Sequence, residues 1–322
     1  MTDPAPANPS EDAVFCIVGA GSIGTSFAVL HAMAGRAVTL FDLDRGAMRA
    51  AEERIATTLA DLLEHGLLDE EPARVASRVA LADDLESAVS GARFVHECVS
   101  ENLELKARLT ADIDRLADRE AVIGSASSAI PASEYARDIP GRARCLVTHP
   151  GNPPFLLRVV EIVPASFTDP EATERARAIL EASGLETIIV RKELRGFVFN
   201  RLQGALLREA YCLVRDGVVD VDEIDAIVRD GLGLRWSVIG PFETVDLNTR
   251  GGIERHARLL GPAYEAMGAE RGQHDPWTDD LIASVTAQRR ALLPMPDWEA
   301  RVRWRDRAIM RTLASRAGGS ER

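Results

Sequence analysis

The sequence predicts an α/β protein, with a mainly parallel sheet domain followed by an all-α C-terminal domain. Between Val14 and about Val190, short β-rich apolar runs alternate with helix-like stretches, which is typical of a parallel sheet covered by helices. Beyond Gly196 these runs stop, and apolar residues recur at helical spacing instead. We therefore expect a sheet domain over residues 13–195 and a helical domain over residues 196–322.

The expected strands are short apolar runs separated by helix-like or turn-like segments. They are VFCIVG (14–19), AVTLFD (37–42), ARFVHECV (92–99), AVIGSA (121–126), RCLVTH (144–149), VVEIV (159–163) and ETIIV (186–190). In the helical domain, Phe197, Leu202, Leu206, Ala210 and Val214 fall on one helix face, and further helices are expected over 221–231, 240–260 and 279–293.

Composition excludes several classes of partner. The chain has 322 residues, 46% of them hydrophobic, which is enough for a sizeable core. A net charge of -12 gives no basic surface for nucleic acid. No apolar run approaches the length that spans a bilayer, and residues 1–12 are expected to form a disordered tail instead of a signal peptide. We expect a cytoplasmic protein with neither a nucleic acid nor a membrane partner.

Neither the cysteines nor the acidic clusters indicate a metal site. The four cysteines are far apart and are expected to be reduced core residues: Cys16, Cys98, Cys145 and Cys212. The acidic residues at 220–225 lack the spacing and central glycine of a calcium loop, so a helix N-terminus is the better interpretation.

A glycine-rich turn predicts a dinucleotide site. Gly19, Gly21 and Gly24 form a GxGxxG pattern, with Ser22 and Ile23 between the last two glycines, directly after one apolar strand and before a helix. Such glycines permit a tight turn, a close approach to a pyrophosphate and close helix packing. The next strand ends at Asp42, about twenty residues on, where a carboxylate can accept from ribose hydroxyls. The pattern predicts a Rossmann-like domain that prefers NAD to NADP, although Arg45 is close in sequence.

A histidine and a glutamate stand out in the last strands. His149 ends one apolar run, and Glu161 lies within the next, where a carboxylate is costly unless it is paired. If these runs are neighbouring strands, Glu161 can hold one imidazole nitrogen and leave the other to exchange a proton with a substrate hydroxyl.

Several motifs occur in an order that resembles the 3-hydroxyacyl-CoA dehydrogenase family over about residues 14–248. They are GAGSIG (19–24), ECVSENLELK (97–106), SASSAIP (125–131), HPGNPP (149–154), VVEIVP (159–164), GFVFNRLQ (196–203), DGLGLRW (230–236) and IGPFE (239–243). Within that family they are most similar to the branch of λ-crystallin and L-gulonate 3-dehydrogenase. The resemblance implies an NAD-dependent oxidation of a 3-hydroxyl.

The resemblance also implies roles for individual residues. His149 is the implied general base and Glu161 its partner, while Ser128 and Asn200 bind the oxygen that becomes a carbonyl. By the same resemblance, Glu101 and Lys106 border the nicotinamide half of NAD; a solvated helix face is the alternative for this pair. Gly151 departs from the bulkier apolar residue expected in the relatives, and this predicts a wider or looser substrate pocket.

Charge distinguishes the candidate substrates. A coenzyme A ester would favour Lys and Arg near its phosphates, but residues 46–80 hold seven acidic residues, four arginines and no lysine. A free carboxylate needs one cation, and Arg235 is the candidate, with Trp236 in the pocket wall. A salt bridge between domains or between subunits is the alternative for Arg235. L-Gulonate is the implied substrate, and L-carnitine and a short-chain 3-hydroxyacyl-CoA are the alternatives.

A structural, crystallin-like protein is the non-enzyme alternative. Such a protein would have no chemical reason to keep all four implied catalytic residues, so the enzyme is favoured. The family further implies a homodimer through the helical domain.

Overall fold

The structure is a computed structural model. It describes residues 14–237, 240–248 and 252–272, together with scattered positions between 280 and 314. The chain divides into two units, one of Met1–Arg201 with Val302–Arg322 and the other of Leu202–Arg301. The expected tail at 1–12 and most of the expected helix at 279–293 lie outside the described residues.

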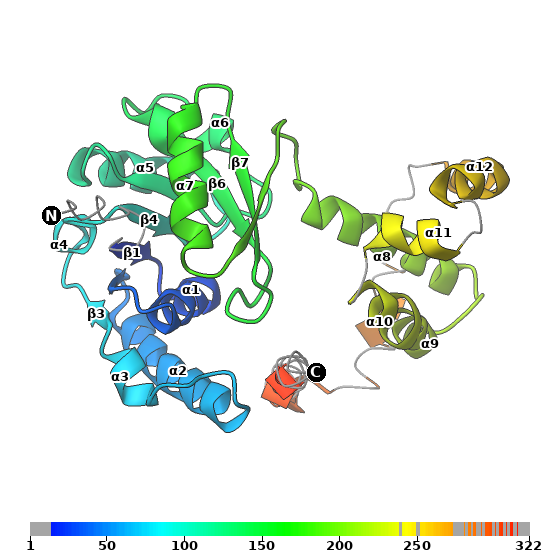
Figure 1. Ribbon diagram of the computed structural model, residues 1–322, viewed down its shortest axis with the longest axis horizontal. Coiled ribbons are helices and arrows are strands. Elements are labelled where there is room, and N and C mark those ends of the chain that lie inside the picture. The colour runs from blue at the N-terminus through cyan, green and yellow to red at the C-terminus, as the bar shows by residue number, and fades with distance from the viewer. Residues whose placement is uncertain are drawn as a thin grey trace, which may run out of the picture. The chain divides into compact units, whose positions relative to one another are not determined.

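The first unit contains one eight-stranded sheet of order β3-β2-β1-β4-β5-β6-β7-β8 (Figure 1). The strands are β1 Phe15–Val18, β2 Val38–Phe41, β3 Val79–Leu81, β4 Phe94–Glu97, β5 Val122–Ser125, β6 Cys145–Pro150, β7 Val159–Pro164 and β8 Glu186–Ile189. Neighbouring strands are parallel except β6 and β7, which pair antiparallel. The predicted mainly parallel sheet and all seven predicted strands are confirmed, and β3 is an additional short strand that was not predicted.

Helices of the first unit cover both faces of the sheet (Figure 1). They are α1 Ser22–Met33, α2 Arg45–Glu64, α3 Pro72–Ala76, α4 Leu85–Val89, α5 Leu103–Leu116, α6 Ala132–Tyr135, η1 Arg142–Arg144 and α7 Pro170–Glu181. Alternate strand residues point to opposite faces. Ile17 therefore packs in the core with α1, α2 and α7, whereas Cys16 and Val18 pack in the core with α4, α5 and α6.

The second unit is helical where it is described, which confirms the predicted fold class. Its elements are α8 Phe199–Arg215, which begins in the first unit, α9 Val221–Ala226, the π-helical turn η2 Ile227–Leu232, α10 Gly233–Trp236, α11 Pro241–Asn248, α12 Gly252–Arg271 and the short η3 Met295–Asp297. The acidic residues at 220–225 lie at the start of α9, where the Glu223 carboxylate accepts from the N–H of Asp220 at 2.8 Å. Their predicted place at a helix N-terminus is confirmed.

Described residues near the C-terminus belong to the first unit. Met310 is 1% exposed within the core that contains α1 and α2. Arg307, from the Arg-rich stretch at 301–307, forms an ion pair with Asp61 of α2 at 2.7 Å. The final segment therefore packs against the sheet domain through at least these side chains.

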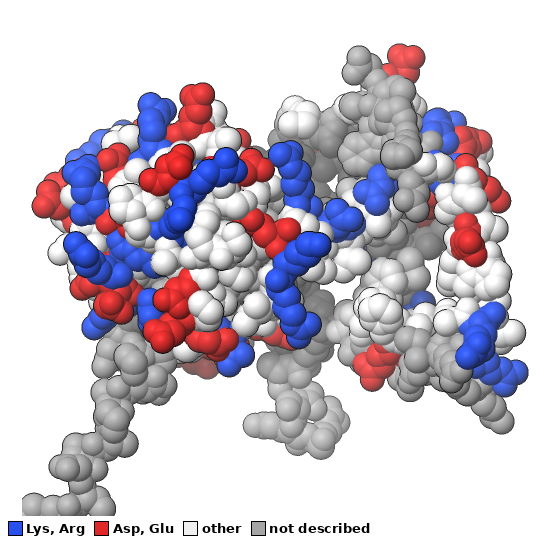
Figure 2. All heavy atoms as spheres, turned by 90° about the horizontal axis from the view of Figure 1, so that it is seen from above, with Lys and Arg blue, Asp and Glu red and all other residues white. Residues whose placement is uncertain are grey.

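Acidic and basic side chains are interspersed on the face that Figure 2 shows. Among the described residues, every helix is too short or too polar to cross a membrane.

Two buried histidines meet between α1, which carries His31, and β4, which carries His96. The Nε2 atoms of His31 and His96 lie 3.0 Å apart, and Nδ1 of His31 lies 3.0 Å from the hydroxyl of Ser183. Burial lowers the pKa of His96 to about 3. Burial, followed by the proximity of His96 and Arg36, holds the pKa of His31 well below its usual value. Both rings are therefore neutral in the folded protein at neutral pH.

We expect this histidine pair to make stability decline as the pH falls below about 6.5. Below that pH the unfolded chain binds protons that the folded protein excludes, so the free energy of unfolding decreases by up to about 1.4 kcal/mol per pH unit for each histidine. Urea unfolding at several pH values between 7.5 and 5.5 measures this slope. A His31→Leu/His96→Leu double variant should show a shallower slope, and an unchanged slope would contradict the assignment.

Candidate active site

The glycine-rich turn lies between β1 and α1. Gly19 has a φ of +111°, and a Cβ there would lie 2.7 Å from the carbonyl oxygen of Cys98. A Cβ on Gly24 would overlap the carbonyl oxygen of Gly19. In contrast, a Cβ on Gly21 would meet no atom within 4 Å. Two of the glycines are thus required by the packing of the turn, whereas Gly21 borders open space.

The N-terminus of α1 and the end of β2 face this turn. No side chain caps α1 and no acidic residue occupies its first turn, while Gly21 and Ser22 are exposed and Ile23 is half-buried. Free N–H groups at a helix N-terminus suit an anion such as a pyrophosphate. The half-exposed Asp42 accepts from the N–H of Ala20 at 2.8 Å, which fixes its carboxylate beside the turn.

The nearest basic side chain to Asp42 in sequence is held elsewhere. Arg45 donates to the Asp83 carboxylate at 3.0 Å and to the Asp83 carbonyl at 3.1 Å. Its guanidinium is therefore engaged on the surface, and a carboxylate at Asp42 suits ribose hydroxyls better than a 2′-phosphate.

His149 and Glu161 face each other across the antiparallel pair β6 and β7. They are in register, and Nδ1 of His149 lies 2.8 Å from Oε2 of Glu161. Both side chains are buried. A carboxylate only accepts, so the Nδ1 atom carries the proton. Nε2 has no partner among the described residues, and it is the nitrogen left to exchange a proton.

Glu161 also holds the start of α8. Its Oε1 accepts from the N–H groups of Val198 at 2.7 Å and Phe199 at 3.0 Å. Burial alone would raise the pKa of Glu161, but the hydrogen bonds from His149 and from these two N–H groups outweigh it and lower the pKa. The carboxylate is therefore ionised at neutral pH.

Backbone conformation directs this helix start toward the histidine. Gly196 has a φ of +74°, and Phe197 has a φ of +47°, which side chains rarely adopt. Phe197 is fully buried, with its ring 5.6 Å from the His149 ring between centroids. Phe197 thus packs against the His149 imidazole, while the N–H groups of Val198 and Phe199 bind Glu161.

Asn200 links the start of α8 to the serine turn, which is formed by Ser127–Ile130. Its Nδ2 donates to the carbonyl oxygen of Ser128 at 2.9 Å. Ser128 is exposed, and its hydroxyl makes no hydrogen bond to the described residues. Residues 198–200 therefore connect the His149–Glu161 pair to Ser128, and the structure brings all four predicted catalytic residues into one network.

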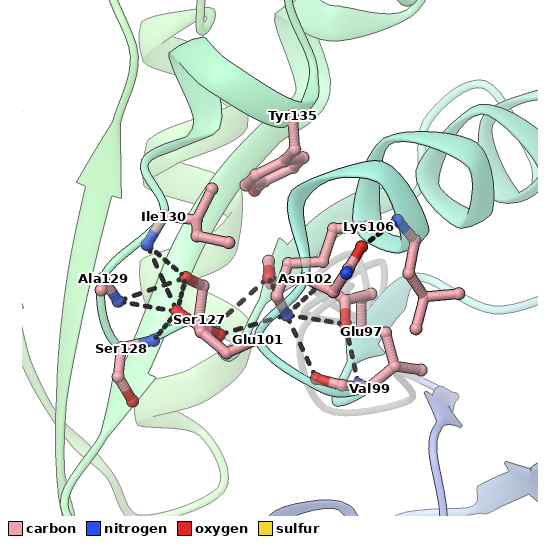
Figure 3. A network of polar contacts seen from close by, with 12 residues as sticks. Glu97, Val99, Glu101, Asn102, Lys106, Ser127, Ser128, Ala129, Ile130 and Tyr135 are labelled. Carbon is pink, nitrogen blue, oxygen red and sulfur yellow. Dashed lines mark hydrogen bonds and ion pairs between the residues drawn. The ribbon is translucent and has the colours of Figure 1, made fainter.

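Glu101 and Lys106 lie beside the turn formed by Ser127–Ile130 (Figure 3). Lys106, on α5, is 1% exposed and forms an ion pair with Glu97 at 3.0 Å, so the solvated helix face considered for it is wrong. Glu101 accepts from the hydroxyl of Ser127 at 2.6 Å.

Arg235 and Trp236 lie on α10 in the other unit, directly after the π-helical turn η2. Turns of this kind occur frequently at functional sites. Both side chains are exposed, and Arg235 makes no hydrogen bond or ion pair with the described residues. Its guanidinium is therefore not held by the described residues of its own unit, and a salt bridge to the other domain or to another subunit stays the alternative for Arg235.

Gly151 is buried in the loop after β6. A Cβ there would lie 2.9 Å from both Cβ and the carbonyl oxygen of Leu157. The position is already filled by Leu157, so the missing side chain leaves no extra room at this point. The expectation of a wider pocket at Gly151 is wrong for this reason.

Sequence reasoning missed three residues that shape the site: Glu97, Ser127 and Phe197. Glu97 lies within the apolar run 92–99, so the argument used for Glu161, that a buried carboxylate needs a partner, would have found it. Ser127 and Phe197 gave no such signal, because their roles come from a turn hydrogen bond and a backbone angle.

Comparisons with known proteins show the family of both parts of the chain. Residues 14–194 match the model of the 3-hydroxyacyl-CoA dehydrogenase NAD binding domain, and residues 196–291 match that of the 3-hydroxyacyl-CoA dehydrogenase C-terminal domain. The chain is 36% identical to a Lambda-crystallin homolog of Bos taurus, over 97% of each chain. It is 36% identical to an L-carnitine dehydrogenase of Pseudomonas putida, over 87% of this chain and 88% of the relative. A solved structure of FHMPC 5-dehydrogenase, an NAD+ dependent dismutase, has a TM-score of 0.76 at 28% identity, over 86% of each chain.

Proposed function

We propose that this chain, which belongs to the 3-hydroxyacyl-CoA dehydrogenase family, oxidises the 3-hydroxyl of a small free hydroxy acid to the 3-keto acid. The family makes it an NAD-dependent dehydrogenase that acts on a CH–OH group. The observation that carries the proposal is the buried His149–Glu161 pair, in which Nε2 of His149 has no partner among the described residues.

In this proposal His149 takes the hydroxyl proton at Nε2. Glu161 orients the ring through Nδ1, and its negative charge stabilises the imidazolium that forms. The Ser128 hydroxyl and the Asn200 amide hydrogen-bond the oxygen as it becomes a carbonyl. These roles need no other titratable side chain at the reacting carbon.

The residues of the glycine-rich turn fit NAD. Gly19, Gly21 and Gly24, with Ser22 and Ile23, would place the N–H groups of α1 against the pyrophosphate. Asp42 would accept from the adenosine ribose, and Glu101 and Lys106 would border the nicotinamide half. When bound, NAD accepts the hydride that leaves the substrate carbon.

The arginines of residues 46–80 support a free acid over a coenzyme A ester. Arg54 donates to the Ala20 carbonyl at 2.6 Å. Arg74 and Arg78 both form ion pairs with Glu70. Three of the four arginines in this segment are therefore engaged within the protein instead of forming a phosphate site.

We further propose that Arg235 binds the substrate carboxylate and that Trp236 forms part of the pocket wall. L-Gulonate is the proposed substrate, because the motifs resemble the branch of λ-crystallin and L-gulonate 3-dehydrogenase. L-Carnitine is the second candidate, favoured by the likeness to an L-carnitine dehydrogenase. The same proposal includes a domain boundary near Arg195 and a role in substrate binding and dimerisation for residues 196–322. It also includes a homodimer and a cytoplasmic location.

Substitution of Gly21 should separate cofactor binding from folding. We expect Gly21→Ala to leave the melting temperature within about 2 °C of the wild type, because its Cβ meets no protein atom, but to raise the Kd for NADH by about tenfold or more. Gly24→Ala should lower the melting temperature as well, because its Cβ overlaps the Gly19 carbonyl. Thermal unfolding and NADH fluorescence measure both quantities. Unchanged NADH affinity in Gly21→Ala would place the cofactor elsewhere.

A substrate panel tests the proposed function. NADH formation is followed with purified protein and L-gulonate, L-carnitine, 3-hydroxybutyrate or 3-hydroxybutyryl-CoA. Turnover that is fastest with a free hydroxy acid supports the proposal. Turnover with the coenzyme A ester alone would overturn the argument from residues 46–80, and fastest turnover with L-carnitine would favour the second candidate.

A further inference from the structure

One carboxylate oxygen holds the turn that carries Ser128. Oε1 of Glu101 accepts from the Ser127 hydroxyl at 2.6 Å and from the N–H groups of Ser128 at 3.0 Å, Ala129 at 2.8 Å and Ile130 at 3.3 Å (Figure 3). Successive N–H groups that converge in this way form an anion-binding concavity. Here the anion is a side chain of the same protein, 27 residues away from Ser128.

Glu101 remains charged in this place. Partial burial would raise its pKa, but the hydrogen bonds from Ser127 and the turn, together with the nearby Lys106, lower the pKa below its usual value. The charge matters because hydrogen bonds to an ionised acceptor are about twice as strong as neutral ones.

Ser128 is thus held from both sides. Its N–H donates to Glu101, and its carbonyl accepts from Asn200 at 2.9 Å. The buried Ser127 adds a further contact, because its hydroxyl accepts from the N–H of Ile130 at 2.7 Å. The main chain of Ser128 is fixed, while its hydroxyl has no partner among the described residues and stays available to a substrate oxygen.

A buried ion pair fixes Glu101 in turn. Nζ of Lys106 lies 3.0 Å from each carboxylate oxygen of Glu97 and 3.6 Å from Oε2 of Glu101. Lys106 and Glu97 are at most 1% exposed, whereas the Glu101 side chain is 40% exposed. Burying an ion pair seldom yields net stability, because the desolvation of both charges offsets their attraction. The place of the Lys106–Glu97 pair next to Glu101 indicates that the pair positions the Glu101 carboxylate.

We propose that Glu101 is a positioning residue for the reaction, held by Lys106 and Glu97, and that it acts by fixing the turn that presents the Ser128 hydroxyl. The inference rests on the proposed function, in which Ser128 binds the oxygen that becomes a carbonyl. It gives Glu101 an effect on the chemical step in addition to its proposed place beside the nicotinamide half of NAD.

Kinetics of Glu101 variants test this role. Glu101→Ala should lower kcat at saturating NAD by about 10²-fold, because a misplaced hydrogen-bond donor costs about that much, whereas the Kd for NADH should rise by less than about tenfold through loss of the carboxylate beside the nicotinamide half. Glu101→Gln keeps one acceptor oxygen without the charge and should recover part of the loss. Glu104→Gln removes an exposed carboxylate from the first turn of α5, three residues after Glu101, and should behave as the wild type. Unchanged kcat in Glu101→Ala, or a rise in the NADH Kd that matches the loss of kcat/KM, would overturn the proposal.

Hydrogen exchange provides a readout that needs no turnover. In the protein without substrate, the amides of Ser128, Ala129 and Ile130 should exchange about tenfold faster in Glu101→Ala than in the wild type or in Glu104→Gln. Unchanged exchange would contradict the proposed hold on the turn. If the wild type oxidises none of the hydroxy acids in the panel, the proposed function fails, but the exchange experiment still decides whether Glu101 fixes the turn.

Discussion

Replacing His149 with glutamine is expected to lower kcat for oxidation of the 3-hydroxy acid by about 10³-fold or more. Nδ1 of His149 donates to the Glu161 carboxylate at 2.8 Å, so Nε2 is the atom that accepts the hydroxyl proton. Glutamine has a similar size, and its amide can still donate to Glu161, but it cannot take up a proton at neutral pH. The loss should therefore fall on kcat, measured by NADH absorbance.

A surface histidine provides the matched control for this variant. His65 lies at the end of α2, where Nδ1 bonds to the Asp61 carbonyl at 2.8 Å. His65→Gln should retain the wild-type kcat, and both variants should bind NADH with a Kd within about twofold of the wild type. A His149→Gln protein that keeps more than about a tenth of the wild-type kcat would rule out His149 as the general base.

Glu161→Gln is expected to lower kcat by about 10²-fold to 10³-fold and to destabilise the start of α8. Glu161 uses one oxygen for His149 and the other for the N–H groups of Val198 and Phe199. Glutamine has only one acceptor oxygen, so its NH₂ group must face either the His149 N–H or these two N–H groups. One side loses its hydrogen bonds in either orientation, and the charge that stabilises the imidazolium is lost in both.

The pH dependence of stability provides a second readout for Glu161→Gln. Because the folded-state pKa of Glu161 is lowered, its carboxylate contributes stability that is present above its ordinary pKa and declines as the pH falls through the folded value. Glu161→Gln should lack this acid-sensitive contribution to the free energy of unfolding. Glu186→Gln, on the exposed side of the neighbouring strand β8, is the control and should keep both the wild-type kcat and the wild-type acid sensitivity. A kcat for Glu161→Gln within about threefold of the control would contradict the role of this carboxylate.

The parts of the fold that could be predicted are those set by local patterns. Seven strands follow from apolar runs, and the turn at 19–24 follows from a glycine pattern in which Gly19 and Gly24 have a steric reason in the structure. The strand β3 escaped prediction because it has only three residues, and two of them are exposed. The π-helical turn η2 also has no local pattern, since its residues were consistent with an ordinary helix.

The candidate site was predictable in its residues but not in its connections. The His149–Glu161 pair follows from two adjacent runs, because a carboxylate in an apolar strand needs a partner. Burial of Lys106 and the hold of Glu101 on the Ser128 turn depend on contacts between β4, α5 and the end of β5. Residues that are 9 to 29 positions apart meet there, and hydropathy along the chain does not encode such pairings.

The most direct test of hydride removal from the 3-carbon uses L-gulonate labelled with deuterium at that carbon. Purified protein is incubated with NAD and the labelled acid, and the NADH formed is analysed by mass spectrometry. The proposed reaction predicts that the deuterium is transferred to NADH, and that His149→Gln forms this product about 10³-fold more slowly. NADH without deuterium, or no NADH from the labelled acid while the protein still binds the cofactor, would contradict oxidation of L-gulonate at its 3-hydroxyl.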